Sequence, residues 1–294
     1  MNKPEEIVLQ VPLEKIMPFP QHPFYVRDDD MMQQLTESIR QVGVLNPVIV
    51  RQMADGSYQL ISGHRRKYAC EILGIASLPV IVRNANEDEA TIMMVDSNFQ
   101  RDVILPSEKA RAYKLKLEAI KHQGERTDLT SVQGGQKLER KTSRQIIAEK
   151  SPDSSSQIQR YIRLNELIPE LLDLVDTGKI ALASAAEISY LREAEQSMLL
   201  LTIESEQAIP SPSQALRMKK LSRSGLLTDD MILNIMMEQK KADAWNLTLP
   251  MNKVAKYFPS TYTPLRMQET IFQLLDQWLA RQIKKSSRKE RVRG

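Results

Sequence analysis

The sequence predicts a multi-domain α+β protein, in which an N-terminal α/β domain precedes a central all-helical domain and a helical C-terminal region. Residues 7–122 alternate between strand-like and helix-like segments, which is typical of a mixed domain. Two helix-start signals follow one another after residue 141, and an apolar stripe at helical spacing lies near the C-terminus. We therefore expect domains over 1–123, 142–205 and 206–294, with a linker over 124–141.

Composition limits the classes of protein to consider. A length of 294 residues is enough for about two domains with real cores, and a formal net charge of +4 is compatible with nucleic-acid binding without establishing it. The single cysteine, Cys70, cannot form an intramolecular disulfide, and the three histidines lack zinc-site spacing. Without a signal-peptide pattern or a long apolar run, we expect a cytoplasmic protein that makes no contact with a membrane.

Short patterns predict the first elements of the N-terminal domain. IVLQV at 7–11 predicts a strand, and apolar residues recur at helical spacing over 32–42, where Gly43 would cap the helix. The dipeptide Asp55-Gly56 lies between two apolar segments and predicts a β-hairpin, because glycine readily adopts the positive φ of such a turn. The hairpin leads directly to Gly63.

The stretch SGHRRKYACEILG places two arginines in the first turn of a short helix that Gly74 ends. Cations are unfavourable there unless an anion arrives, because the first N–H groups of a helix are unsatisfied and its dipole is positive. Gly63 would let an anion approach the backbone, and the guanidinium groups of Arg65 and Arg66 match phosphate oxygens. Two interpretations remain open: a phosphate site, or arginines that are solvated or paired with carboxylates.

A second polar segment follows a further predicted strand. Asn86 and Glu89 form a capping-box pattern for a helix that runs into DSNFQRD, where Asn98, Gln100 and Arg101 concentrate polar groups. Such residues are common helix caps and turn formers. Alternatively, they supply the second wall of a phosphate and metal site with oxygen ligands suited to Mg²⁺.

The central segment contains a candidate helix-turn-helix. Thr142 with Gln145 and Ser154 with Gln157 are capping-box patterns for two helices separated by a short break. In a DNA-binding motif the second helix would enter the major groove, whereas the same pattern also fits a purely structural helical hairpin. The candidate DNA-contacting residues are Arg144, Ser155, Ser156, Gln157, Gln159, Arg160 and Arg163.

The prolines of IPSPSQ after Glu204 indicate a further domain boundary. A final helix is expected from Pro264, with an apolar stripe that favours self-association, formed by Met267, Ile271, Leu274, Leu275, Trp278 and Ile283. The basic residues of the tail 284–294 would either grip DNA phosphates or form a solubilising end.

The motifs GVLNPVIVR, SGHRRKYA and SNFQRDVILPSEKARAY, followed by a helix-turn-helix, resemble the ParB/RepB partition-protein family over roughly residues 7–190. The resemblance implies a ParB/sulfiredoxin-like N-terminal domain that binds CTP with Mg²⁺. It also implies a homodimer that recognises a palindromic, centromere-like site on double-stranded DNA, slides along DNA as a clamp and serves DNA segregation. A nucleoid-associated location and a ParA-type ATPase partner are implied by the family alone.

The resemblance also implies roles for individual residues. Gly63, Arg65 and Arg66 match the glycine and arginines that hold the triphosphate, and Gly43 lies in the first motif beside the pocket. Asn98 matches the metal-coordinating asparagine, and Gln100 and Arg101 match the end of that motif. His64 stands within the nucleotide-binding motif where the family has an acid, and Tyr68 replaces a later arginine.

In the family that the chain resembles, a glutamate implicated in nucleotide hydrolysis stands where this chain has Ser97. Asp96 lies one position early and is expected to point elsewhere on its helix. The family implies a weak CTPase, whereas these residues favour binding with poor or no turnover.

Rival functions leave more of the sequence unexplained. A sulfiredoxin-like enzyme would need a reactive cysteine where the chain has Gly63, and Cys70 is expected to be buried. A phosphotransferase on the same fold would leave the helix-turn-helix without a role. A DNA-binding transcriptional regulator, or a nucleoid-occlusion-like protein of a mobile element without nucleotide turnover, remains the principal alternative.

Overall fold

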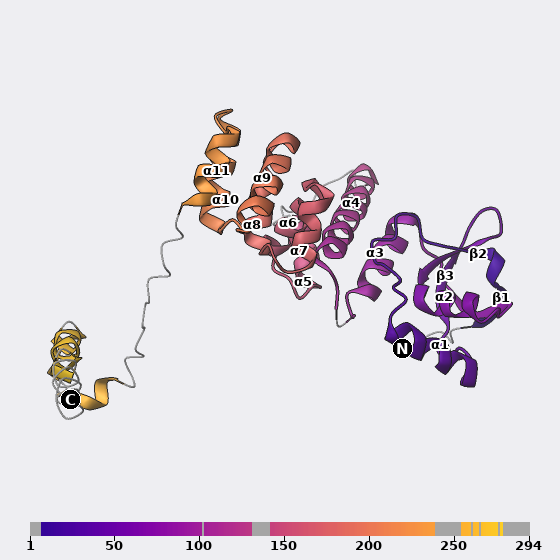
Figure 1. The fold of residues 1–294 in the computed structure, drawn as a ribbon. Coiled ribbons are helices and arrows are strands. Elements are labelled where there is room, and N and C mark those ends of the chain that lie inside the picture. The colour runs from indigo at the N-terminus through magenta and orange to yellow at the C-terminus, as the bar shows by residue number, and fades with distance from the viewer. Residues whose placement is uncertain are drawn as a thin grey trace, which may run out of the picture. The chain divides into compact units, whose positions relative to one another are not determined.

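The computed structural model describes residues 7–101, 103–130, 142–238 and 254–278, the last range without residues 260, 265 and 276. The chain divides into two compact units, Met1–Glu238 and Gln239–Gly294. The first unit contains a mixed sheet with its helices, followed by a group of helices (Figure 1).

The N-terminal sheet has five strands in the order β1-β5-β3-β4-β2. Antiparallel pairing joins β1 to β5 and β3 to β4, whereas β5 pairs with β3 and β4 with β2 in parallel. The predicted hairpin is confirmed, and Gly56 in its turn has φ 82°. The strands are β1 (Val8–Pro12), β2 (Ile16–Met17), β3 (Val48–Gln52), β4 (Tyr58–Ser62) and β5 (Ser77–Val82), with the short helix η1 (Leu13–Lys15) between the first two.

Three helices accompany the sheet: α1 (Asp30–Val42), α2 (His64–Ile72) and α3 (Glu87–Asn98). Gly43 ends α1 with φ 74°, and the capping box at Asn86 is present, as the sequence predicts. Cys70 is buried, and burial raises the pKa of its thiol, which fits an inert structural thiol.

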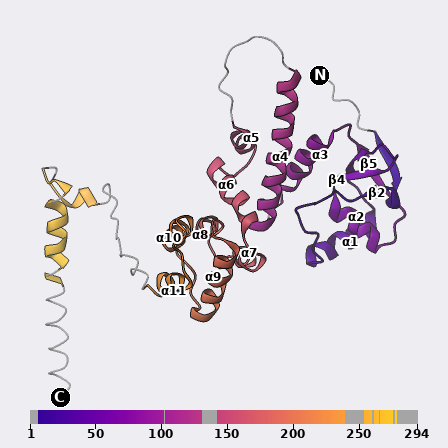
Figure 2. The ribbon, with the colours of Figure 1, turned by 90° about the horizontal axis from the view of Figure 1, so that it is seen from above.

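The long helix α4 (Pro106–Thr130) corrects the expected linker, because residues 124–130 belong to this helix. Ala112 packs in a cluster with residues of the sheet domain, whereas Ala110 and Tyr113 pack in clusters of the following helices. The boundary expected at residue 123 therefore lies within a helix that serves both cores. Figure 2 shows α4 between α3 and the helices that follow.

The helices after residue 142 share one large core that includes Leu171, Ile188 and Leu199. Met218 and Ile232 belong to the same core, so the boundary expected after residue 205 is wrong and the first unit extends to Glu238. The helices are α5 (Ser143–Glu149), α6 (Ser155–Arg163), η2 (Leu164–Glu166), α7 (Pro169–Asp176), α8 (Leu182–Ile188), α9 (Glu193–Glu206), α10 (Pro212–Arg223) and α11 (Asp229–Met237).

One of the two prolines that suggested the boundary starts a helix instead. Pro212 is the first residue of α10, where its missing N–H costs no hydrogen bond, and Ser211 with Gln214 forms a capping box.

The second unit contains η3 (Ala255–Tyr257) and a helix from residue 264. Met267 on this helix is buried, whereas Phe272, Leu275 and Trp278 are more than half exposed. Ile283 and the basic tail lie outside the described residues. Within the ranges that the structure describes, no helix is long and apolar enough to cross a membrane.

Candidate functional site

Gly63 joins β4 to α2 at a point where a side chain cannot be accommodated. Its φ is 106°, and a Cβ atom added there would lie 2.5 Å from Cγ1 of Val48, far inside van der Waals contact. The helix begins at His64, so the two arginines occupy its first turn as predicted, and that turn contains no acidic residue.

The two arginines have different roles. Arg65 lines a cavity, and its guanidinium lies 3.4 Å from Oδ1 of Asp29 with about a third of the side chain exposed. Arg66 donates hydrogen bonds to the carbonyl oxygens of Asn46 and Pro47, which ties α2 to the loop before β3. Burial lowers the pKa of Arg66. Of this pair, only Arg65 presents its charge to the cavity.

The cavity measures about 240 Å³ and carries more positive than negative groups. Glu108 accepts hydrogen bonds from the N–H groups of Tyr25 and Leu105 at 2.8 and 2.9 Å, so its carboxylate is already committed. Arg101 lies over the ring of Phe24, with 5.4 Å from its Cζ to the ring centroid. The lining residues are Tyr25, Arg27, Asp29, Met31, Arg65, Gln100, Arg101, Val103 and Glu108.

The structure brings only part of the predicted nucleotide site together. Arg65, Gln100 and Arg101 line the cavity, whereas the other candidates do not. The other lining residues are four alternate residues of the segment 25–31, which leads into α1, together with Val103 and with Glu108 in the first turn of α4. Asp29 is the N-cap of α1. The run of aspartates at 28–30 could have predicted this helix start, because aspartate is a preferred N-cap residue. The candidates outside the cavity lining are Gly43, Gly63, His64, Arg66 and Asn98.

The groups near this cavity fit Mg²⁺ only as an ion that arrives with phosphate oxygens. Asn98 is buried and donates its amide nitrogen to the Met94 carbonyl oxygen at 2.8 Å, so only its carbonyl oxygen could serve as a metal ligand. The carboxylates of Asp29 and Glu108 already accept hydrogen bonds from backbone N–H groups, that of Asp29 from Met32. Among the described residues, no group of three or more His, Cys, Asp or Glu could hold a metal ion.

The residues at the expected hydrolytic position are also committed. Asp96 forms an ion pair with Lys116 of α4, so it points elsewhere, as the sequence predicts. Ser97 donates its hydroxyl to the Met94 carbonyl oxygen at 3.0 Å. Neither side chain lines the cavity.

His64 stacks on His22, with ring centroids 3.7 Å apart. Nδ1 of His22 lies 2.7 Å from the carbonyl oxygen of Phe24, which can only accept, so we assign the proton to Nδ1. Both ring nitrogens of His64 and Nε2 of His22 are buried without a hydrogen-bond partner in the described chain. Burial lowers the pKa of His64 to about 3 and that of His22 to about 4, so both rings are neutral at pH 7.

Aromatic rings continue from this pair to the candidate DNA-binding helix. His22 contacts Phe24, whose ring centroid lies 6.1 Å from that of Phe99. Phe99 in turn lies 4.8 Å from Tyr113 of α4, and Tyr113 lies 6.0 Å from Tyr161 of α6. These spacings are those of interacting aromatic pairs. Packed side chains therefore connect the arginine motif with the candidate helix-turn-helix.

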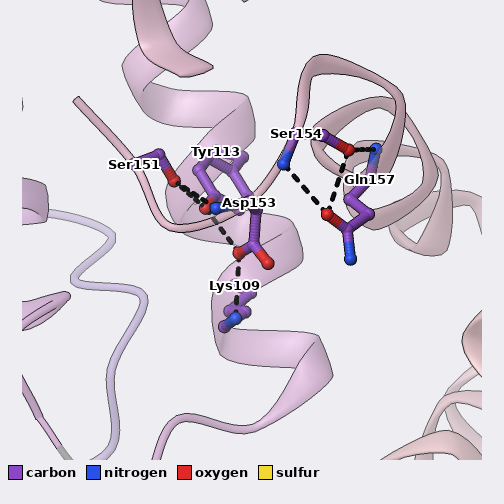
Figure 3. A network of polar contacts seen from close by, with 6 residues as sticks. All are labelled: Lys109, Tyr113, Ser151, Asp153, Ser154 and Gln157. Carbon is purple, nitrogen blue, oxygen red and sulfur yellow. Dashed lines mark hydrogen bonds and ion pairs between the residues drawn. The ribbon is translucent and has the colours of Figure 1, made fainter. Parts of the chain in front are cut away.

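A polar network fixes the turn between α5 and α6 to α4 (Figure 3). The hydroxyl of Tyr113 lies 2.5 Å from Oγ of Ser151 and 2.7 Å from Oδ2 of Asp153. Lys109 forms an ion pair with the same carboxylate at 2.9 Å. Burial raises the pKa of Tyr113, which keeps its phenol protonated as a donor. The turn is thus held by buried hydrogen bonds rather than by its own backbone alone.

Both predicted capping boxes are present, at Thr142 for α5 and at Ser154 for α6. The apolar side of the pair is anchored by Ile147 and Ile158, which are buried against Tyr113. These contacts leave the opposite side of α6 to solvent.

The candidate DNA-contacting residues on α6 and α5 divide into free and committed groups. Ser156 and Arg160 are exposed, and the Ser156 hydroxyl lies 3.1 Å from Oγ of the N-cap residue Ser154. Gln157 is exposed but closes the capping box, and Arg144 donates to Oε1 of Gln159 at 2.5 Å. Arg163 is turned toward α8, as described below. Ser155 is half-buried at the start of the helix.

A hollow of about 450 Å³ lies beside these helices. Arg144, Gln159 and Arg163 reach it from α5 and α6, and Lys121 of α4 adds a cation that sequence reasoning missed. Lys121 belongs to no sequence motif, and it reaches the hollow only because α4 packs against α6. The remaining lining residues are Leu117, Thr142, Ser143 and Ile162.

The sequence is similar to those of known proteins over part of its length. Residues 1–99 match the family model described as the ParB N-terminal domain. Over 194 residues the chain is 29% identical to a nucleoid occlusion protein of Listeria innocua, covering 66% of this chain and 61% of that protein. Over 189 residues it is 28% identical to the chromosome-partitioning protein Spo0J of Thermus thermophilus, covering 64% and 62%. The chain thus matches about three fifths of the length of these relatives.

Among solved structures, C-terminally truncated ParB from Caulobacter crescentus, complexed to the centromeric parS site, is 22% identical with a TM-score of 0.44. That match covers 74% of this chain and 99% of the other. The same protein complexed with CTP-γ-S is 25% identical with a TM-score of 0.30, covering 67% and 98%.

Proposed function

We propose that this chain, whose residues 1–99 belong to the ParB N-terminal domain family, is a sequence-specific DNA-binding partition protein whose N-terminal cavity binds CTP. The helix-turn-helix formed by α5 and α6 carries the proposal. Both helices are capped, their turn is fixed by a buried network, and the exposed side of α6 is polar and basic. Such a helix suits readout of base edges in the major groove of double-stranded DNA.

The cavity supports the nucleotide half of the proposal. Arg27, Arg65 and Arg101 outnumber the carboxylates of Asp29 and Glu108 along its lining. The contact between Arg65 and Asp29 is long at 3.4 Å, so phosphate oxygens can replace the carboxylate on that guanidinium. Mg²⁺ would accompany the phosphates, with Asn98 as its protein ligand.

We expect weak or no CTP hydrolysis. Asp96 is held by Lys116, and the Ser97 hydroxyl is bonded to its own helix, so neither is available as a general base. Binding without turnover is sufficient for a nucleotide that controls the conformation of a DNA clamp.

The remaining parts of the proposal concern assembly. The exposed apolar side chains of Phe272, Leu274, Leu275 and Trp278 suit self-association, and a homodimer matches a palindromic DNA site. DNA binding places the protein on the nucleoid. A ParA-type ATPase partner follows from the family alone.

A second candidate is a DNA-binding regulator, or a nucleoid-occlusion-like protein, that works without nucleotide turnover. One observation favours it: Arg66 is committed to two backbone carbonyls, so a motif arginine expected at the triphosphate has another role here.

Nucleotide titrations separate the two candidates. CTP, ATP and GTP are titrated with Mg²⁺ into wild type and Arg65→Ala, with and without a duplex selected from a random library. Selective CTP binding that Arg65→Ala weakens at least tenfold supports the partition clamp. Selection of a defined duplex without any nucleotide binding supports the regulator, and failure to enrich any duplex overturns both.

A further inference from the structure

Three cationic side chains converge on the ring of Tyr190, just beyond the end of α8. Nζ of Lys219 lies 3.8 Å from the ring centroid, and Cζ of Arg163 lies 4.0 Å from it. Cζ of Arg223 lies 4.9 Å from the same centroid. We call Tyr190 with Arg163, Lys219 and Arg223 the Tyr190 patch. The ring attracts each cation, which allows like charges to be held close together.

The charges of the patch are only partly balanced. Lys219 forms an ion pair with Glu187 at 2.6 Å. Arg163 donates to Ser189 through both Nε and Nη2, which fixes its position without neutralising its charge. Arg223 is exposed and makes neither a hydrogen bond nor an ion pair with any residue in the described ranges. Three cations therefore face a single carboxylate, and one guanidinium has all its donors available.

The patch adjoins the proposed DNA-reading helix. Arg163 is the last residue of α6, and its bonds to Ser189 fasten that helix to the end of α8. Helix α10, which carries Lys219 and Arg223, packs against α8. A helix in the major groove is flanked by phosphates of the DNA backbone, so cations beside its end lie where those phosphates run.

We propose that the Tyr190 patch binds phosphates of the DNA backbone beside the segment that α6 reads. The proposal rests on the DNA binding proposed above and assigns a contact to α10, a helix outside the helix-turn-helix. Lys219 and Arg223 would make sequence-independent contacts that fix the orientation of α6 in the groove. Free phosphate offers the same chemistry, so the experiment must distinguish it from DNA.

The test measures how salt weakens the binding of the full-length protein to a 30-bp duplex of mixed sequence. The double variant Lys219→Gln/Arg223→Gln removes two phosphate contacts, so the slope of log K against log salt becomes shallower by about 1.8. The fall in affinity between 50 and 200 mM salt then shrinks by about tenfold relative to wild type. Arg223→Lys, which keeps the charge, should retain the wild-type slope.

The matched control is Arg40→Gln/Arg217→Gln, which removes the same charge from exposed arginines already paired with Glu37 and Glu238. Equal slopes for the control and the double variant overturn the patch, whereas absence of salt-dependent DNA binding by wild type overturns the proposed function. Circular dichroism verifies that each variant is folded.

A competition experiment distinguishes DNA from free phosphate as the ligand of the patch. Inorganic phosphate at 10 mM, with ionic strength held constant, should not displace the duplex. Displacement from wild type but not from the double variant would identify a free-phosphate site instead.

Discussion

Gly63 is subject to two independent constraints, a positive φ and the side chain of Val48, which leaves no room for a Cβ atom. Gly63→Ala should therefore lower the free energy of unfolding by about 2 to 4 kcal/mol, since strain and overpacking add. Gly178→Ala is the matched control, because Gly178 has φ 74° but nothing within 4 Å of an added Cβ, and should cost about 1 kcal/mol. Urea denaturation measures both, and equal losses would contradict the close packing at Gly63.

The His22–His64 stack predicts a pH-dependent stability. The pKa of His64 is about 3 and that of His22 about 4 in the folded chain, against 6.5 as the ordinary value. The unfolded chain therefore binds more protons below pH 6.5, so the stability from the neutral rings is complete above that pH. It is lost as the pH falls toward the folded pKa values.

His64→Phe keeps a ring against His22 and removes one titrating group. The decline in free energy of unfolding from pH 6.5 to 4.5 should become shallower by roughly 1 kcal/mol per pH unit. Urea denaturation at several pH values gives this slope. An imidazole signal of His64 that titrates near pH 6.5 in NMR spectra would contradict the buried neutral pair.

Residue types alone could not separate the two motif arginines. The sequence correctly placed Arg65 and Arg66 in the first turn of a helix and left open whether they are paired. A guanidinium group can donate hydrogen bonds to phosphate oxygens or to backbone carbonyl oxygens. Arg66 binds the carbonyl oxygens because the fold brings the loop at Asn46 and Pro47 next to it. The stacking of His22 on His64 could likewise not be predicted, because 42 positions separate the two residues and no sequence pattern links them.

At the scale of elements, the turn between α5 and α6 depends on a hydroxyl of α4. Tyr113→Phe keeps the aromatic ring between Phe99 and Tyr161 but removes the hydroxyl that donates to Asp153. The free energy of unfolding should therefore fall by about 1 to 2 kcal/mol. Tyr161→Phe is the control, since the Tyr161 hydroxyl has no hydrogen-bond partner in the described part of the chain, and should change stability by less than about 0.5 kcal/mol. Thermal unfolding compares them, and a neutral Tyr113→Phe would refute the role of the network.

The exposed side of α6 should affect DNA binding without affecting stability. Arg160→Ala is expected to weaken binding to a selected duplex about 10- to 100-fold, the loss of about 1 to 3 kcal/mol typical of an arginine contact. Lys179→Ala, an exposed cation at the start of the α7–α8 connection, should weaken it less than threefold. Fluorescence anisotropy measures both affinities. Equal effects would mean that α6 contributes only general charge.

Local signals predicted elements better than they predicted their grouping. Capping boxes at Thr142 and Ser154 gave the starts of α5 and α6, because a cap is a contact between residues three apart. The glycine-containing segment after residue 123 suggested a linker, yet α4 continues through Gly124 to Thr130. A single exposed glycine costs a helix only about 1 kcal/mol, which the packing of α4 on both sides outweighs.

At the scale of the whole molecule, the extent of the first unit depends on contacts distant in sequence. The core residues of α10 and α11 pack with those of α7, α8 and α9, although the prolines between Glu204 and Pro212 resembled a domain boundary. Local composition reports where a helix starts, whereas a domain boundary is defined by where few contacts cross. Only the three-dimensional packing places that boundary after Glu238.

Two truncations distinguish these boundaries. A chain ending at Glu238 should unfold cooperatively with the thermal midpoint of the corresponding transition in the full chain, because its core is complete. A chain ending at residue 205 lacks Met218, Ile232 and Ile235, each fully or almost fully buried in the core. At about 1.5 to 3 kcal/mol for each side chain, this loss is comparable with the whole stability of a domain, so the remaining helices should fail to form a cooperative core. Calorimetry with equal midpoints for both truncations would restore the boundary at residue 205 and detach α10 and α11 from the helical core.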